Sequence, residues 1–131
     1  MKQKLEVVAA LIQQGEQFLI CQRPADKAQG NLWEFAGGKV EQGETPEQAL
    51  VRECREELEI DIEPKELFME ITHEYTDRIV HLMLFYARIK AGKPFNKEHQ
   101  KLCWATPAEM QQYEFCPADV PILEKLKEKM Q

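Results

Sequence analysis

Three glutamates, Glu53, Glu56 and Glu57, have the spacing that places carboxylates on one side of a helix. At 100° per residue they fall within one third of the helix circumference. Like charges three or four residues apart destabilise a helix by ~0.2–0.5 kcal/mol per pair. A hard divalent cation such as Mg²⁺ binds clustered oxygen ligands and shares its shell with water and substrate phosphates. The spacing therefore indicates a metal site, and the alternative is a solvated acidic helix face.

The segment around these glutamates is predicted to be a helix that follows a glycine-containing loop. Thr45 suits the N-cap, Pro46 suits the first helical position, and Gln48 completes a capping box. A second face of the helix is apolar and is expected to pack on a core: Leu50, Val51, Cys54 and Leu58. In the loop, Gly37 and Gly38 lack side chains, so their backbone can approach a metal ion closely. The loop thus favours the metal site over the solvated face.

The loop and helix together resemble the Nudix box, Gly-x5-Glu-x7-Arg-Glu-U-x-Glu-Glu-x-Gly-U, where U is an aliphatic residue. Seven fixed positions match at the required spacing within residues 38–60: Gly38, Glu44, Arg52, Glu53, Glu56, Glu57 and Ile60. Two positions depart from the pattern, because Cys54 replaces an aliphatic residue and Glu59 replaces the last glycine. Glycine at that place would serve a left-handed turn at the helix end. We therefore expect Glu59 to affect the following loop but not the carboxylate cluster.

The resemblance implies a hydrolase in which water attacks a phosphorus of a nucleoside diphosphate linked to another group. It implies Mg²⁺ as cofactor, with Mn²⁺ as a substitute, held by the Gly37 carbonyl and by Glu53, Glu56, Glu57 and Glu98. The implied catalytic residues are Glu53, Glu56, Glu44 and Glu98. Glu53 is the leading candidate for the base that orients the water, and the sequence does not rank it against Glu44 or Glu98.

The resemblance extends over nearly the whole chain and is greatest to the MutT branch of the family. It rests on Arg23, on residues 32–39 (Leu-Trp-Glu-Phe-Ala-Gly-Gly-Lys), on residues 98–100 (Glu-His-Gln) and on residues 117–121 (Pro-Ala-Asp-Val-Pro). These likenesses imply nucleotide- and phosphate-binding roles for a larger set: Arg23, Glu34, Phe35, Gly38, Lys39, Arg78 and Asp119. By themselves, Arg23 and Lys39 would be ordinary surface charges, and Asp119 would equally suit the N-cap of the last helix.

The activity implied by the resemblance is cleavage of a nucleoside triphosphate to a monophosphate and pyrophosphate, in sanitation of the nucleotide pool. The likeness to bacterial CTP pyrophosphohydrolases favours CTP, dCTP or a 5-modified dCTP as substrate. Oxidised dGTP (8-oxo-dGTP) is the alternative substrate. A catalytically inactive Nudix domain that senses a nucleotide or binds a protein is the alternative class. Such domains usually lose box carboxylates, whereas this chain keeps Glu53, Glu56 and Glu57.

Length, charge and cysteine usage limit the remaining classes. The 131 residues are expected to form one domain, 1–131, and the net charge of −6 argues against nucleic-acid and anionic-membrane partners. Residues 41–59 alone hold seven Glu against two Arg. The four cysteines form no CxxC pair, and no secretion signal or membrane span is evident, so we expect free thiols in a cytoplasmic monomer or homodimer. The three histidines show no ligand spacing, so core or surface positions are expected for them.

The remaining elements predict an α/β protein with the Nudix fold, an α/β/α sandwich whose mixed sheet lies between the box helix and a C-terminal helix. Strands are expected over 5–12 and 17–23 as a hairpin, over 32–35, over 67–75 and 79–89 as an antiparallel pair, and over 102–105. Residues 61–65 and 91–100 are expected to be connections. Thr106 repeats the capping signature before a short helix, and the last helix is expected to end at Met130.

Overall fold

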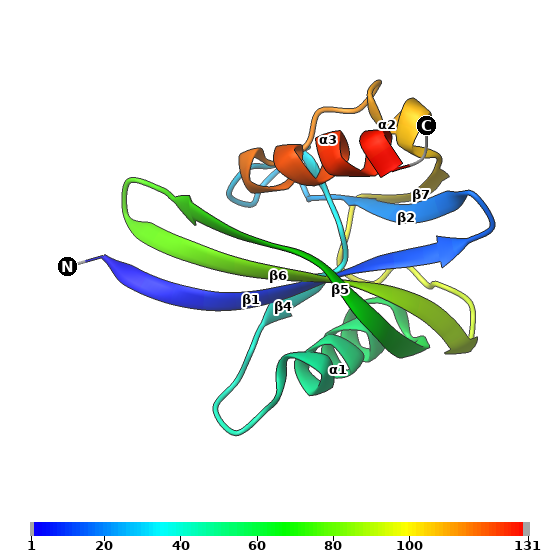
Figure 1. Cartoon of the computed structure of the whole chain (residues 1–131), viewed down its shortest axis with the longest axis horizontal. Coiled ribbons are helices and arrows are strands. Elements are labelled where there is room, and N and C mark those ends of the chain that lie inside the picture. Colours follow the sequence, from blue (N-terminus) through cyan, green and yellow to red (C-terminus); the bar gives the residue numbers. More distant parts are fainter. Residues whose placement is uncertain (1, 130–131) are drawn as a thin grey trace.

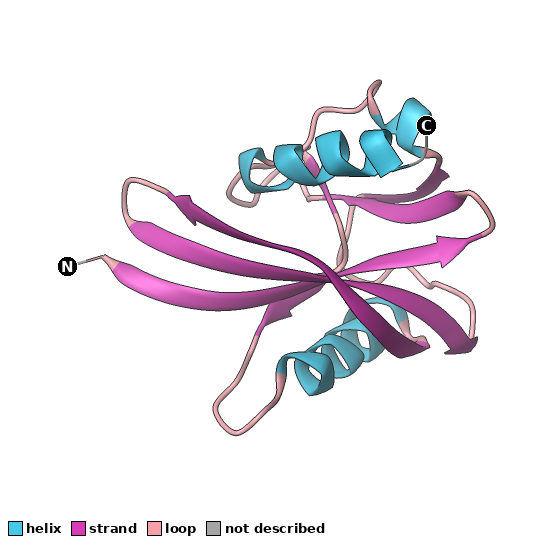
Figure 2. Ribbon diagram, viewed as in Figure 1, coloured by secondary structure: helices cyan, strands magenta, loops and turns pink. Residues whose placement is uncertain are grey.

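The computed structural model describes residues 2–129 of the chain. Their elements are, in order, β1 (Gln3–Gln14), β2 (Gln17–Gln22), β3 (Trp33–Glu34), β4 (Gly37–Lys39), α1 (Pro46–Leu58), β5 (Asp61–Glu74), β6 (Arg78–Ala91), β7 (Lys101–Ala105), α2 (Pro107–Met110), the 3₁₀ turn η1 (Pro117–Asp119) and α3 (Val120–Lys129). The strands form a mixed sheet with α1 on one face and with α2 and α3 on the other (Figures 1 and 2). The predicted α/β/α sandwich is confirmed.

Strand β1 joins the two halves of this sheet. It runs parallel to β6 from Gln3 to Ile12, and it pairs antiparallel with β4 and, at its far end, with β2. On one side β5 continues the sheet as the antiparallel partner of β6, and on the other β3 and β7 flank β2. Because the middle of β1 is paired on both edges and covered on both faces, residues 8–12 are buried.

Side chains of β1 point alternately to the two faces and so contribute to two separate cores. The core beneath α1 combines alternate β1 residues with the predicted apolar face of the helix: Val8, Ala10, Ile12, Leu50, Cys54 and Leu58. The core beneath α3 combines the intervening β1 residues with the C-terminal region: Ala9, Leu11, Phe115, Ile122 and Leu126. The sheet is thus held between two apolar layers, and each layer fixes one helix relative to it.

Two segments differ from the predicted strand pattern. Residues 37–39, expected in a loop, form strand β4 by pairing with Val7 to Ala9. Residues 61–65, expected as a connection, are the first part of β5, so that prediction is wrong. Pro64 disguised this strand: it lies next to an irregularity in the pairing with β6, on the last strand in the sheet order, where a missing N–H is tolerated. The last helix is present as α3, and Met130 lies outside the described residues.

The four cysteines are free thiols, as predicted from their scattered positions. Cys21, Cys54 and Cys116 are buried. Burial, helped by nearby carboxylates, raises the pKa of the Cys54 thiol, and it raises the pKa of Cys116 to about 12. These thiols remain protonated and act as small apolar packing groups rather than nucleophiles.

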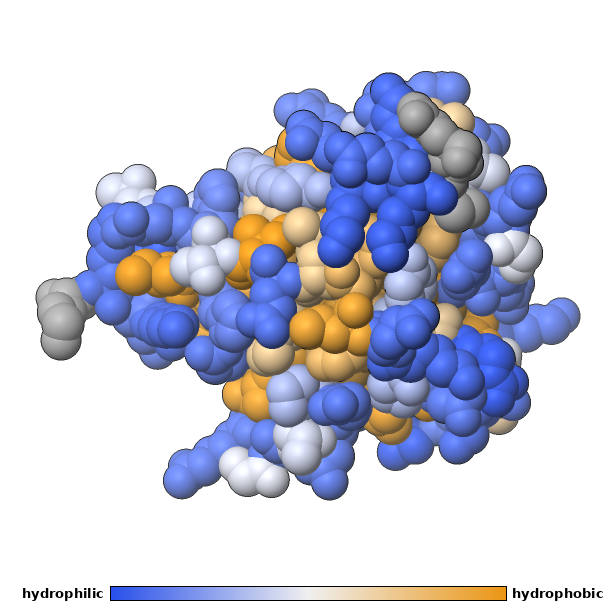
Figure 3. Space-filling model, in the orientation of Figure 1, coloured by the Kyte–Doolittle hydropathy of each residue, from blue (hydrophilic) through white to orange (hydrophobic). Residues whose placement is uncertain are grey.

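The surface in the view of Figure 3 is mostly hydrophilic over both helical layers. Apolar side chains reach the surface between the layers, over the crossing of β5 and β6. Leu67 on β5 is 44% exposed. Within residues 2–129, no helix combines the length and the apolarity that crossing a membrane requires.

Candidate active site

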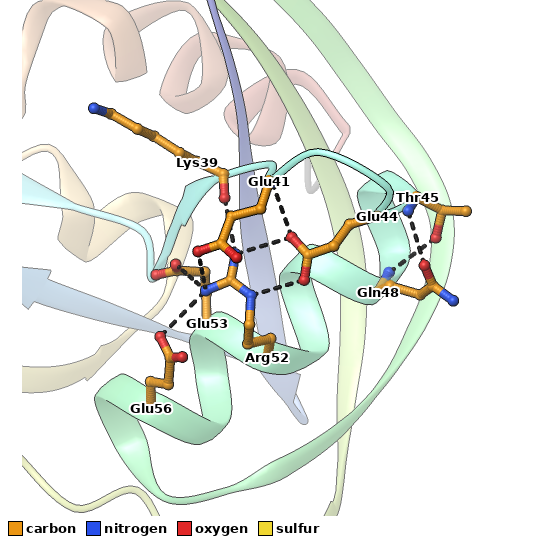
Figure 4. A network of polar contacts seen from close by, with 8 residues as sticks. All are labelled: Lys39, Glu41, Glu44, Thr45, Gln48, Arg52, Glu53 and Glu56. Atoms are coloured by element: carbon orange, nitrogen blue, oxygen red, sulfur yellow. Dashed lines mark hydrogen bonds and ion pairs between the residues drawn. The ribbon is translucent and has the colours of Figure 1, made fainter.

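Helix α1 begins where the capping signature predicted. The Thr45 hydroxyl accepts a hydrogen bond from the backbone N–H of Gln48 (3.1 Å). The backbone N–H of Thr45 donates to the side-chain oxygen Oε1 of Gln48 (2.9 Å; Figure 4). At its other end, Glu59 has φ 57° and ψ 37°, the left-handed conformation that glycine would favour. Glu59 therefore ends the helix as a glycine would, at the roughly 1–2 kcal/mol that this conformation costs a residue with a side chain.

Arg52 is the centre of a carboxylate network at the outer side of α1 (Figure 4). Its Nε and Nη2 donate to the two oxygens of Glu44 at 2.7 and 3.0 Å. Its Nη1 donates to Glu53 (2.7 Å) and Glu56 (3.2 Å), and Nη2 also reaches the Lys39 carbonyl (3.0 Å). This network lowers the pKa of Glu44, chiefly through the hydrogen bond from Arg52. One guanidinium thus offsets the repulsion among three predicted site carboxylates and ties α1 to the loop before it.

Gly37 and Gly38 lie in strand β4 for two different packing reasons. A Cβ on Gly37 would collide with the Val8 carbonyl on β1, so this glycine allows the two strands to approach. A Cβ on Gly38 would overlap the Glu53 carboxylate. Gly38 therefore leaves the space into which Glu53 fits, a reason that the sequence alone did not show. The loop of the box and its helix are matched through this contact.

Glu57 lies at the inner side of the same helix and is only 6% exposed. Desolvation, the adjacent carboxyl of Glu53 and the charges of Glu34 and Glu98 raise the pKa of Glu57 to about 10. Its Oε2 is buried and has no hydrogen-bond partner among residues 2–129. A buried carboxyl that faces further carboxylates gains charge balance only if a cation or a proton joins it.

These residues fit a divalent cation in charge and in donor type. The oxygens are hard donors, the orphaned Oε2 of Glu57 is directed at no protein group within the described chain, and Glu98 lies in the exposed loop that follows β6. Across residues 2–129, no three His, Cys, Asp or Glu side chains converge closely enough to hold a metal by themselves. Mg²⁺ usually takes one or two carboxylates and fills its shell with water and phosphate, so an open set of ligands suits it.

His99 also belongs to this site, although no ligand spacing in the sequence marks it as a site residue. Its side chain is 5% exposed, and its Nε2 lies 3.3 Å from Oε2 of Glu34 and 3.5 Å from Oε1 of Glu57. The side chain is buried, as a core position requires, but it lies among site carboxylates, which the prediction did not include. The signal in the sequence was its place in residues 98–100, which resemble the MutT branch.

A cavity of about 550 Å³ opens on the α3 side of the sheet, next to the glycines of β4. All seven residues predicted to bind the nucleotide and its phosphates line it: Arg23, Glu34, Phe35, Gly38, Lys39, Arg78 and Asp119. Gly37 also lines it, whereas five predicted carboxylates do not: Glu44, Glu53, Glu56, Glu57 and Glu98. The volume lies in the range of small-molecule sites. The structure therefore separates one predicted set, around the cavity, from a second set on and beyond α1.

The polar lining of the cavity is organised by an ion pair between Arg23, which follows β2, and Glu34 on β3. Arg23 donates to Glu34 through Nη1 (3.1 Å) and to the Ala28 carbonyl through Nε (2.7 Å). Phe35 is 4% exposed and packs against Phe115, so it is partly a core residue. Glu34 thus faces Arg23 with one oxygen and His99 with the other.

Two further polar residues line this cavity. Asp119 is 7% exposed and is the last residue of the 3₁₀ turn η1, directly before α3. Burial, followed by the charge of Glu34, raises the pKa of Asp119 well above its usual value. The Arg78 guanidinium lies 4.9 Å from the ring centre of Tyr75, which also lines the cavity. Both residues line the cavity with polar groups that a base or a sugar can contact.

Comparison with known families shows that residues 7–125 match the family described as NUDIX domain. The chain is 47% identical over 120 residues to the CTP pyrophosphohydrolase of Escherichia coli strain K12. The aligned residues cover 92% of this chain and 89% of that protein. It is 37% identical over 125 residues to the 8-oxo-dGTP diphosphatase of the same strain, with coverages of 95% and 97%. The solution structure of the E. coli ORF135 protein matches with a TM-score of 0.85 at 43% identity, covering 98% of this chain and 92% of that one.

Proposed function

We propose, on the premise that this chain belongs to the Nudix family of hydrolases, that it cleaves nucleoside triphosphates to a monophosphate and pyrophosphate. In this reaction water attacks a phosphorus of the triphosphate chain, and pyrophosphate leaves. The observation that carries the proposal is the cavity, because it gathers all seven predicted nucleotide-binding residues, among them Gly38, which lies against the Glu53 carboxylate. The proposed role of the protein is the removal of modified or surplus nucleotides. It is proposed to act in the cytoplasm as a monomer or homodimer of one domain.

Nudix hydrolases use divalent metal ions, and we propose Mg²⁺ for this protein, with Mn²⁺ as a substitute. The ligands are the Gly37 carbonyl and the carboxylates of Glu53, Glu56, Glu57 and Glu98. When bound, the ion neutralises phosphate charge and favours ionisation of water. The buried and unpaired Oε2 of Glu57 supports this assignment, because a cation removes the cost of keeping it among other carboxylates.

Glu53 is the proposed base that orients the attacking water. Glu44 is less suited to this role, because both of its oxygens accept hydrogen bonds from Arg52 and its pKa is lowered. Glu53 shares only one guanidinium nitrogen with Glu56 and lies against Gly38, at the edge of the cavity. Glu56 and Glu98 serve as further carboxylates at the metals. Arg23, Lys39 and Arg78 supply positive charge for the phosphates and the nucleotide.

The nucleobase that we propose for the substrate is cytosine, and Asp119 is the residue that we propose to recognise it. An ionised carboxylate only accepts hydrogen bonds, so it pairs with the amino group of cytosine and repels the O4 acceptor of uracil or thymine. When uracil or thymine is bound, the buried carboxylate has no hydrogen-bond donor to pair with, at a cost of about 1–3 kcal/mol. This cost is the source of the proposed selectivity for cytosine. The similarity to a CTP pyrophosphohydrolase supports this assignment.

The raised pKa of Asp119 favours a second candidate, 8-oxo-dGTP. A carboxyl that takes up a proton becomes a donor as well as an acceptor, and it can then serve a base edge that carries both groups. The 37% identity to an 8-oxo-dGTP diphosphatase points in the same direction. The two candidates therefore differ in the protonation state of one side chain, and pH separates them.

The test is pyrophosphate release with Mg²⁺ from CTP, dCTP, 5-methyl-dCTP, UTP, dTTP and 8-oxo-dGTP across a range of pH. We expect the cytosine nucleotides to exceed UTP and dTTP by at least ~10-fold in kcat/KM. The ratio should rise with pH as Asp119 loses its proton, because only the ionised form rejects O4.

Asp119→Asn is the matched variant, since it keeps the shape of the side chain and both kinds of hydrogen-bonding group at every pH. Its selectivity should be lower and independent of pH. Equal hydrolysis of CTP and UTP by both proteins would rule out the cytosine assignment. Nucleotide binding without turnover of any substrate would instead assign the chain to the inactive sensors of the family.

A further inference from the structure

We propose that His99 is a positioning residue that fixes Glu34 against Glu57 and thereby couples the nucleotide cavity to the metal-binding side of α1. This inference deepens the proposed function and rests on it. Glu34 lies on β3 and lines the cavity, whereas Glu57 lies on α1 and is the buried member of the proposed metal ligands. His99 comes from neither element, because it belongs to the loop between β6 and β7.

The contacts place a single nitrogen between the two carboxylates. Nε2 of His99 lies 3.3 Å from Oε2 of Glu34 and 3.5 Å from Oε1 of Glu57. The other oxygen of Glu34 accepts a hydrogen bond from Arg23 at 3.1 Å. A continuous row therefore runs from Arg23 in the cavity through Glu34 and His99 to Glu57. A hydrogen on Nε2 can be donated to Glu34, and Glu57 lies in polar contact with the same nitrogen, so this nitrogen sets the separation of the two carboxylates.

The loop that carries His99 is fastened on both sides of the site. The Phe95 amide donates to the Leu58 carbonyl at the end of α1 (2.8 Å), and the Gln100 amide donates to the Gln22 carbonyl on β2 (2.8 Å). The His99 amide itself donates to Oδ1 of Asn96 (3.0 Å). Because the backbone is held next to both α1 and β2, the imidazole has little freedom to leave the gap between Glu34 and Glu57.

The remaining nitrogen of the ring indicates that His99 does more than fill space. Nδ1 is buried and has no hydrogen-bond partner among residues 2–129. If His99 were held only by packing, both of its ring nitrogens would be buried without a polar contact, and each would cost free energy. Instead, Nε2 faces the site and contacts both carboxylates.

His81 provides a matched comparison within the same chain. It also lies between two carboxylates, with Nδ1 against Glu6 and Nε2 3.0 Å from Glu70. Its side chain is 21% exposed, and its partners lie on β1 and β5, outside the residues that line the cavity. Removal of His81 thus deletes an imidazole with two carboxylate contacts but leaves the row from Arg23 to Glu57 intact.

The experiment measures binding at both sides of His99, in the full chain and without turnover. Three quantities are determined for wild type, His99→Leu, His99→Gln, His99→Asn and His81→Leu. They are Mn²⁺ affinity without nucleotide, CMP affinity in EDTA, and CMP affinity with saturating Mn²⁺. Melting temperatures are recorded for every protein.

We expect His99→Leu to weaken Mn²⁺ binding by at least ~10-fold, the usual effect of losing a group that orients a metal ligand. The factor by which Mn²⁺ changes CMP affinity should fall toward one. Gln places its amide nitrogen near the position of Nε2 and should restore both quantities to within ~3-fold, whereas Asn reaches only the position of Nδ1 and should not. His81→Leu should leave both quantities unchanged.

The outcomes separate this inference from the proposed function. Wild-type protein that binds neither Mn²⁺ nor CMP would overturn the proposed function and, with it, the role of His99. Wild-type binding that His99→Leu and His99→Asn leave unaltered would overturn the role of His99 alone. If His99→Leu fails to fold, the comparison of His99→Gln with His99→Asn decides, since equal coupling in these two would exclude a specific contact through Nε2.

Discussion

At the outer end of the acidic cluster on α1, Glu44, Glu53 and Glu56 share the guanidinium of Arg52, whereas at the inner end Glu57 faces His99 and further carboxylates. The outer end is partly open to solvent, since Glu56 is 57% exposed and Arg52 is 23% exposed. The inner end is buried, and Oε2 of Glu57 has no partner in the described chain.

This difference distinguishes charges that the protein balances from charges that it leaves for a ligand. At the outer end, the network joins the helix to the loop before it and lowers the pKa of Glu44, so it contributes to the fold. At the inner end, no lysine or arginine within residues 2–129 pairs with Glu57, and the ring nitrogen that approaches it belongs to His99. A cluster of glutamates on one helix therefore contains both a structural part and a binding part, and sequence spacing does not separate them.

The largest expected effect comes from removing one charge at each end. Glu57→Gln should lower kcat by at least ~10²-fold, because it removes a proposed metal ligand without changing the shape of the side chain. Glu44→Gln should lower it much less, since the amide oxygen still accepts one hydrogen bond from Arg52. Pyrophosphate release measured with saturating Mg²⁺ and CTP tests both variants.

Glu53→Gln provides the control at the boundary between the two ends and should lose as much activity as Glu57→Gln, through loss of base or metal function. Near wild-type turnover of Glu57→Gln, with a large loss for Glu44→Gln, would reverse the comparison and place the binding part at the outer end.

The next effect concerns stability at the outer end alone. Arg52→Ala should lower the free energy of unfolding by about 1–2 kcal/mol, because several carboxylates and the Lys39 carbonyl lose their donor. Arg55→Ala is the matched control: it removes an arginine of the same helix that pairs with Asp61 (2.6 Å) and whose side chain is 63% exposed. It should change stability by less than about 0.5 kcal/mol. Urea denaturation measures both, and equal losses would mean that the network contributes nothing beyond an ordinary surface pair.

The helix and its cluster could be predicted from local sequence, whereas the inner end could not. Thr45, Pro46 and Gln48 fix the start of α1 through contacts between near neighbours, and those contacts are present as expected. The assignment of seven residues to one nucleotide site came from resemblance, and the cavity brings them together. None of these inferences needed knowledge of how distant segments pack.

His99 shows what local sequence lacks. Its place depends on hydrogen bonds that join residues far apart in the chain, such as the one between Gln100 and Gln22, 78 positions away. The role of Gly38 is hidden in the same way, because the group that needs its space is the carboxylate of Glu53. Strand β4 and the first part of β5 were missed because glycine and proline usually mark loops, and only the pairing with β1 and β6 makes them strands.

A smaller effect should come from supplying the cation that the inner end lacks. Mg²⁺ that binds only the folded protein stabilises it by mass action, by about 1.4 kcal/mol at ten times its Kd. The melting temperature should therefore rise with Mg²⁺ for wild type and for Arg52→Ala, and it should not rise for Glu57→Gln. Differential scanning fluorimetry over a Mg²⁺ series measures this. A rise that persists in Glu57→Gln would place the ion elsewhere.

The smallest effect tests the rule of charge balance at a second site, where His81 lies between Glu6 and Glu70 on the sheet. Hydrogen bonds that the His81 ring donates, to Glu6 first and to Glu70 second, raise the pKa of His81 above its usual value of 6.5. The folded protein therefore binds this proton more tightly than the unfolded chain. The resulting stabilisation is complete below pH 6.5 and is lost as pH rises through the raised value of the folded state.

Because the pair is partly exposed and screened, we expect a loss of only about 0.5 kcal/mol across this range. Urea denaturation at several pH values above 6, without metal, should show that decline in wild type and a flatter profile in His81→Gln, which keeps hydrogen-bonding groups but cannot titrate. An identical decline in both proteins would assign the pH dependence to another group. If wild-type stability instead rose with pH, His81 would be held in its neutral form, and the carboxylates around it would not be balanced as those around Arg52 are.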